Sequence, residues 1–178
     1  PGLDQAQREQ ATTLLQTANK PAIVCGLEAR DSATTTAARK LVQKLGCPAL
    51  VTYKAKGVIP DNNDSFVGIF TGGAAEKPAV IEADLIILVG LDPVELILQP
   101  WPYETDTIEL SLTRHPKHYL EPAASLFGPL PTSLLALDKA AKPSGWSPER
   151  IGLLRETICE SLRYGKVEHG LSPETVVT

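Results

Sequence analysis

Five consecutive aliphatic residues, Leu85–Val89, limit the possible folds of this chain more than any other feature of its sequence. No polar residue alternates with them, so a strand formed here has both faces covered, as central strands of parallel sheets do. The run is also far shorter than the ~20 apolar residues that a membrane-spanning helix requires. It therefore predicts the central strand of a layered α/β fold.

A strand-helix-strand unit lies ahead of this segment. Pro21–Cys25 is a short apolar run, and residues 48–51 form a second one. Between them, Asp31 or Ser32 can cap a helix that Gly46 ends. At this spacing the two strands should be parallel, with a right-handed crossover. The apolar stripe of the helix consists of Ala33, Ala37, Ala38, Leu41, Val42 and Leu45.

The remaining elements repeat the same alternation. Three more strands are predicted at residues 66–70, 108–112 and 124–127, and four more helices at residues 4–18, 77–83, 129–140 and 147–162. Prolines at 93, 100 and 102 indicate a loop with one helical turn at residues 95–98. The sequence thus predicts a doubly wound, Rossmann-like parallel sheet of about five or six strands with helices on both faces.

Composition excludes several classes of function. The 178 residues are 43% hydrophobic and carry a formal net charge of -4. They contain no run of Lys and Arg that could neutralise adjacent phosphates, so neither a nucleic-acid partner nor a membrane partner is expected. Three widely spaced cysteines predict buried thiols in a reducing compartment rather than disulfides, and the cytoplasm is the expected place.

Ligands of doubly wound sheets bind in the crevice beyond the carboxyl ends of the strands. Glycines there let a backbone approach a phosphate closely, although a glycine that ends a strand can equally serve a tight turn. The chain has no G-x-G-x-x-G and no G-x-x-x-x-G-K-[ST], so both interpretations stay open. The candidate binding residues are Gly26, Leu27, Lys56, Gly57, Gly72, Gly73, Gly90 and Asp92.

No catalytic or metal-binding group is predicted. His115 and His118 have a suitable spacing for a metal, but they lack a third ligand and stand beside Arg114 and Lys117. An exposed basic loop is the expected structure there. The chain also has no nucleophile elbow and no local Ser/His/Asp cluster. Without a dinucleotide fingerprint, a free-standing dehydrogenase is not expected either.

Three stretches of the sequence carry a family resemblance. They read ANKPAIVCG, then ARKLVQKLGCPALVTYKAKGVIPDNNDSFVGIF, then IEADLIILVGLDP. Together they resemble the central domain of thiamine-diphosphate-dependent enzymes of the acetolactate synthase and benzoylformate decarboxylase group, over roughly residues 5–140. The most specific part is the junction from Gly46 and Pro48 through Lys56-Gly57 to Pro60.

The resemblance implies a larger enzyme that joins or decarboxylates 2-oxo acids. Its flanking domains would hold thiamine diphosphate and Mg²⁺, and the full-length chain would form a homodimer or homotetramer. The middle domain would be a non-catalytic scaffold. In some members of the family this domain binds FAD or ADP, and an adenine-nucleotide module is the alternative for this chain. Because Glu28, Asp92 and Glu95 should repel a pyrophosphate, we expect no such ligand.

The resemblance and the ends of the sequence together suggest a division of the chain. We expect residues 1–142 to be the central domain, and residues 143–178 to be a linker, a helix and the truncated entry to a C-terminal cofactor-binding domain. The sequence has no methionine. Its last residues also resemble the start of a helix, with Ser172 as the N-cap and Pro173 in the first position. Both features are expected of a fragment.

Overall fold

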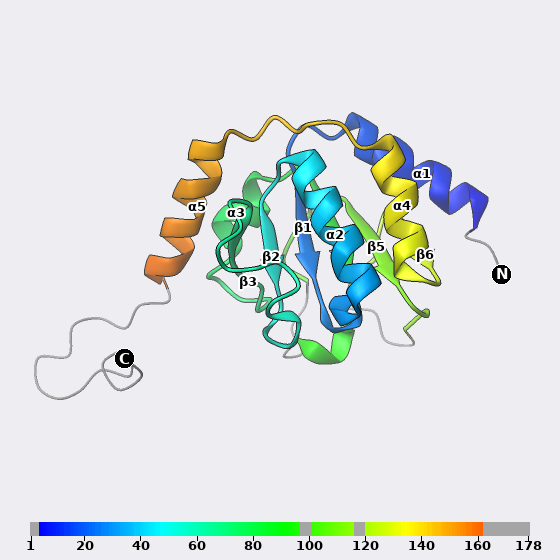
Figure 1. Ribbon diagram of the computed structural model, residues 1–178, viewed down its shortest axis with the longest axis horizontal. Coiled ribbons are helices and arrows are strands. Elements are labelled where there is room, and N and C mark those ends of the chain that lie inside the picture. Colours follow the sequence, from blue (N-terminus) through cyan, green and yellow to red (C-terminus); the bar gives the residue numbers. More distant parts are fainter. Residues whose placement is uncertain (1–3, 97–100, 116–119, 162–178) are drawn as a thin grey trace, which may run out of the picture.

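The computed structural model describes residues 4–96, 101–115 and 120–161. Its centre is a sheet of six parallel strands in the order β3-β2-β1-β4-β5-β6 (Figure 1). The order of the strands reverses between β1 and β4, which is the arrangement of a doubly wound fold. The predicted fold class is therefore confirmed. The strands are β1 Pro21–Cys25, β2 Ala49–Val51, β3 Phe66–Ile69, β4 Leu85–Val89, β5 Thr107–Ser111 and β6 Ala124–Phe127.

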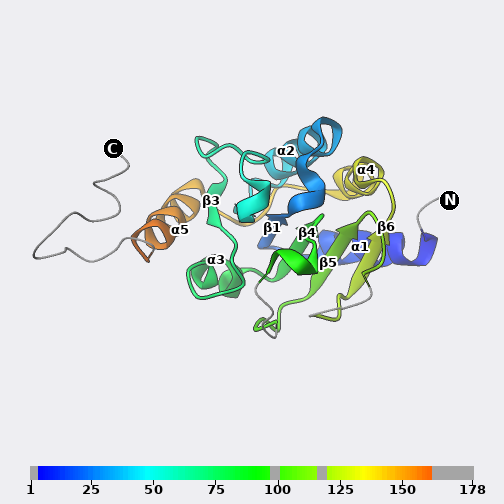
Figure 2. The same ribbon diagram turned by 90° about the horizontal axis from the view of Figure 1, so that it is seen from below.

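Helices cover both faces of this sheet. Figure 2 looks along the strands and shows α2 and α4 on one face, with α1 and α3 on the other. The helices are α1 Gln5–Thr17, α2 Ser32–Leu45, α3 Lys77–Glu82, α4 Leu130–Ala140 and α5 Pro148–Ser161. Every residue of β1, β2, β4 and β5 is buried, because these strands lie between two helical layers. None of the helices in the described residues is long and apolar enough to cross a membrane.

The caps of α2 show how local sequence sets the helix ends. The Asp31 carboxylate accepts the backbone N–H groups of Ala33 and Thr34 at 3.1 and 3.0 Å. Gly46 ends the helix in the left-handed conformation, with φ of 58°. The predicted apolar stripe was wrong at one position, because Ala33 is exposed and Thr34 is buried in its place. Asp31 takes the cap, so Ala33 falls in the first turn on the solvent side.

Two other elements differ slightly from their predictions. β5 runs from Thr107 to Ser111, one residue earlier than expected, and Leu112 beyond it is half exposed. Register explains the shift, since Thr107 pairs with Ile86 of the central strand. The helical turn predicted at residues 95–98 was wrong in position, because the 3-10 turn lies at Pro93–Glu95, where Asp92 caps it, and Leu96 is already extended; residues 97 and 98 lie outside the described residues. The predictions for residues 162–178 also lie outside them.

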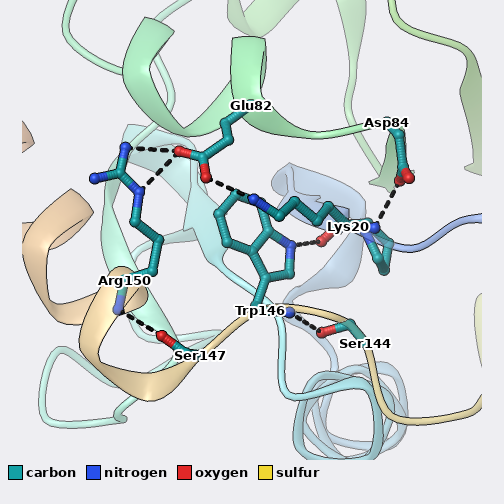
Figure 3. A network of polar contacts seen from close by, with 8 residues as sticks. Lys20, Glu82, Asp84, Ser144, Trp146, Ser147 and Arg150 are labelled. Carbon is teal, nitrogen blue, oxygen red and sulfur yellow. Dashed lines mark hydrogen bonds and ion pairs between the residues drawn. The ribbon is translucent and has the colours of Figure 1, made fainter.

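The segment between α4 and α5 crosses the amino-terminal ends of the strands, and α5 packs against β3 (Figure 1). Figure 3 shows how this segment is held. The Trp146 indole N–H donates to the carbonyl of Pro21 at 2.8 Å, and the Lys20 ammonium lies 4.8 Å from the Trp146 ring centroid. Glu82 of α3 accepts from Lys20 at 2.8 Å and from two guanidinium nitrogens of Arg150 at 2.7 and 2.9 Å. The carboxyl-terminal edge of the sheet remains free of this segment.

Candidate functional site

The crevice expected from the strand order lies where the turns after β1 and β4 meet. These two turns are in direct contact. Gly26 donates its N–H to the carbonyl of Val89 at 2.8 Å, and Glu28 donates its N–H to the carbonyl of Gly90 at 3.0 Å. The structure thus brings the predicted residues Gly26, Leu27, Gly90 and Asp92 together at one point of the carboxyl-terminal edge.

Close packing explains why two of these positions are glycine. A Cβ atom on Gly26 would lie 2.5 Å from the carbonyl oxygen of Gly90 and 2.5 Å from the Cα of Leu91. Gly90 has φ of 62°, and a Cβ there would lie 2.8 Å from the backbone nitrogen of Ala29. Both glycines therefore serve the contact between the two turns.

The carboxylate of Glu95 lies at the centre of this group of residues. Its Oε1 accepts the backbone N–H of Leu27 at 2.6 Å and that of Asp92 at 3.2 Å. Its Oε2 accepts the hydroxyl of Thr52, which directly follows β2. Asp92 uses its own carboxylate to accept the N–H of Val94 at 2.9 Å. One side chain thus joins the ends of β1, β2 and β4.

Glu28 forms a similar connection to the end of β5. Its Oε2 accepts the Leu112 N–H at 2.9 Å and the Ser111 hydroxyl at 3.0 Å, and its Oε1 lies 3.5 Å from His115 Nε2. The same Nε2 lies 3.0 Å from Ser111 Oγ. A catalytic triad needs the two ring nitrogens to face the nucleophile and the acid separately, so this cluster does not have triad geometry.

The prediction of an exposed basic loop was wrong for His115, whose side chain is only 15% exposed. Glu28 and Ser111 draw the ring inward, and no local pattern could have shown this because Glu28 is far away in the sequence. His118 and Lys117 lie outside the described residues. Arg114 places its guanidinium carbon 5.2 Å from the ring centroid of Phe127.

Lys56 and Gly57, the other pair predicted for the crevice, contact different partners. The ammonium of Lys56 lies 3.5 Å from a carboxylate oxygen of Asp61, and both side chains are mostly exposed. Gly57 has φ of 93°, and its carbonyl accepts from the guanidinium of Arg39 on α2 at 2.8 Å. This contact holds the loop after β2 against α2.

A cavity of about 510 Å³ opens beside Glu95, between the ends of β2 and β3. Thr52, Phe70 and Leu96 contribute to its wall. Gly72 does not line the cavity, although a Cβ on that residue would lie 3.8 Å from the side chain of Leu96, which does. The Gly73 N–H, predicted as an anion donor, points to the Thr71 hydroxyl at 3.0 Å.

A buried acid lies under this loop and was missed by the sequence analysis. Glu76 is fully buried; its Oε2 accepts from the Thr71 hydroxyl at 3.1 Å, while its Oε1 has no hydrogen-bond partner among the described residues. Burial raises the pKa of Tyr103, and the nearby Glu76 carboxylate raises that pKa further. Tyr103 packs edge-on against Trp101, with ring centroids 5.2 Å apart. Packed aromatic rings therefore hold this loop.

The residues at this edge do not fit a pyrophosphate-bearing cofactor such as FAD or ADP. The backbone donors of Leu27 and Asp92 are already taken by Glu95, and a second carboxylate, Glu28, lies in the same turn. A metal fits no better, since the part of the chain that the structure describes has no group of three or more His, Cys, Asp or Glu placed to hold an ion. The edge has acceptors where anion binding requires donors.

Comparison with known proteins agrees with this architecture. At the level of single relatives, the chain is 38% identical to mouse 2-hydroxyacyl-CoA lyase 1 over 80 residues, which are 45% of this chain and 13% of the relative. It is 26% identical to acetolactate synthase of Bacillus subtilis (strain 168) over 131 residues, covering 70% of the chain and 23% of the relative. The chain therefore spans less than a quarter of the length of either protein.

A solved structure assigned to a thiamin diphosphate-dependent enzyme of Mycobacterium smegmatis has the same fold. It superimposes with a TM-score of 0.67 and 20% identity, over 83% of this chain and 30% of the other. The model of the family "thiamine pyrophosphate enzyme, central domain" matches residues 8–118, which is more than half of the chain. The match runs from α1 through β5 and includes the contact between the β1 and β4 turns. This chain therefore belongs to the central-domain family of thiamine-pyrophosphate-dependent enzymes.

Proposed function

We propose that this chain is the non-catalytic scaffold of a thiamine-diphosphate-dependent enzyme that joins or decarboxylates 2-oxo acids or related acyl compounds. The observation that supports the proposal is the hydrogen bonding of the polar side chains at the carboxyl-terminal edge. Its acidic and hydroxyl side chains, Glu28, Glu95, Thr52 and Ser111, are engaged in hydrogen bonds that join strand ends. A general acid or base has to reach a substrate, and these groups instead hold the sheet together.

The reaction class rests on what the relatives are named. Acetolactate synthase, 2-hydroxyacyl-CoA lyase and a pyruvate decarboxylase of pea all match part of this chain. A lyase or a transferase reaction on a 2-oxo or 2-hydroxyacyl substrate is common to these names. In this proposal, thiamine diphosphate and Mg²⁺ bind to parts of the polypeptide beyond residues 1–142, and residues 143–178 lead into a C-terminal cofactor-binding domain.

The partners proposed for this domain are the other domains of the same polypeptide. Three large apolar side chains are exposed on the loops that follow β2, β4 and β5: Tyr53 at 70%, Val94 at 80% and Leu112 at 49%. All three belong to the carboxyl-terminal edge, which the segment before α5 leaves open (Figure 1). We propose that the rest of the polypeptide covers these three side chains.

The proposal extends to assembly and compartment. We propose a homodimer or homotetramer for the full-length enzyme and the cytoplasm as its location. All three cysteines are free, and burial raises the pKa of the Cys25 thiol to about 12. The prediction of buried thiols was wrong for Cys159, which is exposed as a free thiol on α5, because the neighbouring Ile158 takes the buried face of the helix. An exposed free thiol persists most easily in a reducing compartment.

The test compares the isolated chain with the full-length polypeptide. Both are supplied with thiamine diphosphate, Mg²⁺ and pyruvate, and in a second series with a 2-hydroxyacyl-CoA. We expect turnover only by the full-length protein, and no change in the melting temperature of the isolated chain when thiamine diphosphate is added. Turnover by residues 1–178 alone would contradict the proposal.

A further inference from the structure

The contacts of Glu95 are those of a bound anion. Backbone N–H groups from the turns after β1 and β4 donate to one of its oxygens, and a hydroxyl at the end of β2 donates to the other. In doubly wound sheets this point, where the strand order reverses, is where the phosphates of a ligand bind. The carboxylate therefore lies where a ligand's anionic group would lie.

A simpler explanation is that Glu95 only caps its own 3-10 turn, Pro93–Glu95, in a capping box with Asp92. The cap accounts for the contact to the Asp92 N–H at 3.2 Å. It does not account for the shorter contact to Leu27 at 2.6 Å, nor for the one to Thr52, which are 68 and 43 residues away in the sequence. These two long-range contacts make the side chain more than a local cap.

The surroundings of Glu95 also disfavour a second anion. Glu28 follows Leu27 directly and places its carboxylate against Ser111 and Leu112 on the other side of the β1 turn. Like charges in such a partly buried crevice repel each other strongly. The two turns also leave no room between them. The carbonyl oxygen of Gly90 and the Cα of Leu91 occupy the space that a side chain on Gly26 would fill.

We propose that the Glu95 carboxylate occupies the position of a ligand's anionic group in this crevice. It thereby prevents the domain from binding nucleoside diphosphates. The carboxylate replaces an external ligand in joining the ends of β1, β2 and β4, so the domain is stable without one. This inference goes beyond the proposed scaffold function and does not depend on which reaction the full-length enzyme performs.

Chemical rescue tests the proposal directly. Replacing Glu95→Ala removes the carboxylate but leaves the Leu27, Asp92 and Thr52 donors and the cavity beside them, which is large enough for acetate. We expect the melting temperature of the isolated chain to fall by roughly 4–8 °C. Acetate or formate should restore most of this loss, whereas chloride at equal ionic strength and neutral acetamide should not.

The controls separate occupation of the site from general salt effects. The wild-type chain and a Glu156→Ala variant, which removes an exposed carboxylate on α5, should not respond to acetate. If Glu95→Ala melts at the wild-type temperature, or gains no more from acetate than Glu156→Ala does, the proposal is wrong. Stabilisation of the wild-type chain by millimolar ADP would also overturn it, because the donors would then be open.

A second variant covers the case in which Glu95→Ala does not fold. Glu95→Gln keeps the shape and one acceptor oxygen but removes the charge, and it should fold. We expect the amide proton signal of Leu27 to move upfield in its NMR spectrum, because a charged acceptor forms the stronger hydrogen bond. An unchanged Leu27 signal would show that Glu95 does not hold this amide.

Discussion

At the scale of single residues, glycine is required for different physical reasons at different positions of this domain. Gly46 ends α2 with a positive φ, and no atom of the described residues lies within 4 Å of its would-be Cβ. Gly26 has φ of -110°, which any residue can adopt, yet backbone atoms lie within 2.5 Å of its would-be Cβ. Conformation requires the first glycine and packing requires the second.

We predict that Gly26→Ala destabilises the chain by about 1–3 kcal/mol, since a methyl group would force the β1 and β4 turns apart. The matched control is Gly152→Ala in α5, where no atom of the part of the chain that the structure describes lies within 4 Å of the added Cβ. That change should be stabilising by about 0.5–1 kcal/mol because alanine favours the helix. Urea unfolding measures both, and a neutral result for Gly26→Ala would contradict the packing explanation.

The Glu82 carboxylate should give stability a defined dependence on pH. Hydrogen bonds from Arg150 and Lys20 lower its pKa from the ordinary value of 4.5 (Figure 3). Its contribution is therefore fully present above the ordinary pKa and is lost as the pH falls through the lowered one. We expect Glu82→Gln to lose about 1 kcal/mol at pH 7 and to approach the wild type in acid. Unfolding midpoints that differ equally at both pH values would exclude this ion pair as the cause, and Glu156→Gln is the control.

At the scale of elements, α5 is the helix whose placement depends most on distant contacts. It packs against β3, where Gly68 leaves room for it, since a Cβ on that residue would lie 2.8 Å from Ile158. Trp146 anchors the chain ahead of α5 to the first residue of β1. α5 thus covers the outermost strand, β3, through contacts with residues far from it in the sequence.

We predict that Trp146→Phe destabilises the chain by about 1–3 kcal/mol, because it leaves the buried carbonyl of Pro21 without its donor. Hydrogen exchange of the α5 amides should become faster than in the wild type, as local opening becomes easier. Leu153→Ala, a change of a half-exposed residue on the same helix, should stay within about 0.5 kcal/mol. If the two variants behave alike, Trp146 does not anchor α5.

At the scale of the whole molecule, one end of the sheet is covered by the chain and the other is exposed. The amino-terminal end is crossed by the segment between α4 and α5 (Figure 1). The carboxyl-terminal end exposes Tyr53, Val94 and Leu112. At the same end, Glu95 accepts a hydrogen bond from Thr52 and Glu28 accepts one from Ser111. The open end is therefore suited to contact with the rest of the polypeptide proposed above.

We predict that Val94→Lys reduces the activity of the full-length enzyme several-fold while leaving the stability of the isolated chain within about 0.5 kcal/mol of the wild type. Ile81→Lys provides the control, because Ile81 is 70% exposed but lies on α3, away from this edge. Steady-state assays of the full-length variants and urea unfolding of the isolated ones measure the difference. Equal losses of activity in the two variants would contradict a special role for the edge.

The sequence alone determined the elements of this protein and their order. Leu85–Val89 and Pro21–Cys25 read as strands because a strand buried on both faces requires an unbroken apolar run. Asp31 and Gly46 marked the ends of α2, since capping depends on residues within one turn of the helix end. The apolar runs and the helix caps depend on interactions between residues close together in the sequence, so the sequence shows them directly.

Only the tertiary structure decided what the crevice contains. The sequence placed Gly26, Leu27, Gly90 and Asp92 at the correct edge, but not the contact of Glu95 with Leu27, because 68 residues separate the two. The inward position of His115 has the same cause. The partner that a side chain meets across the sheet depends on strand order and register. These are established only when the whole domain folds.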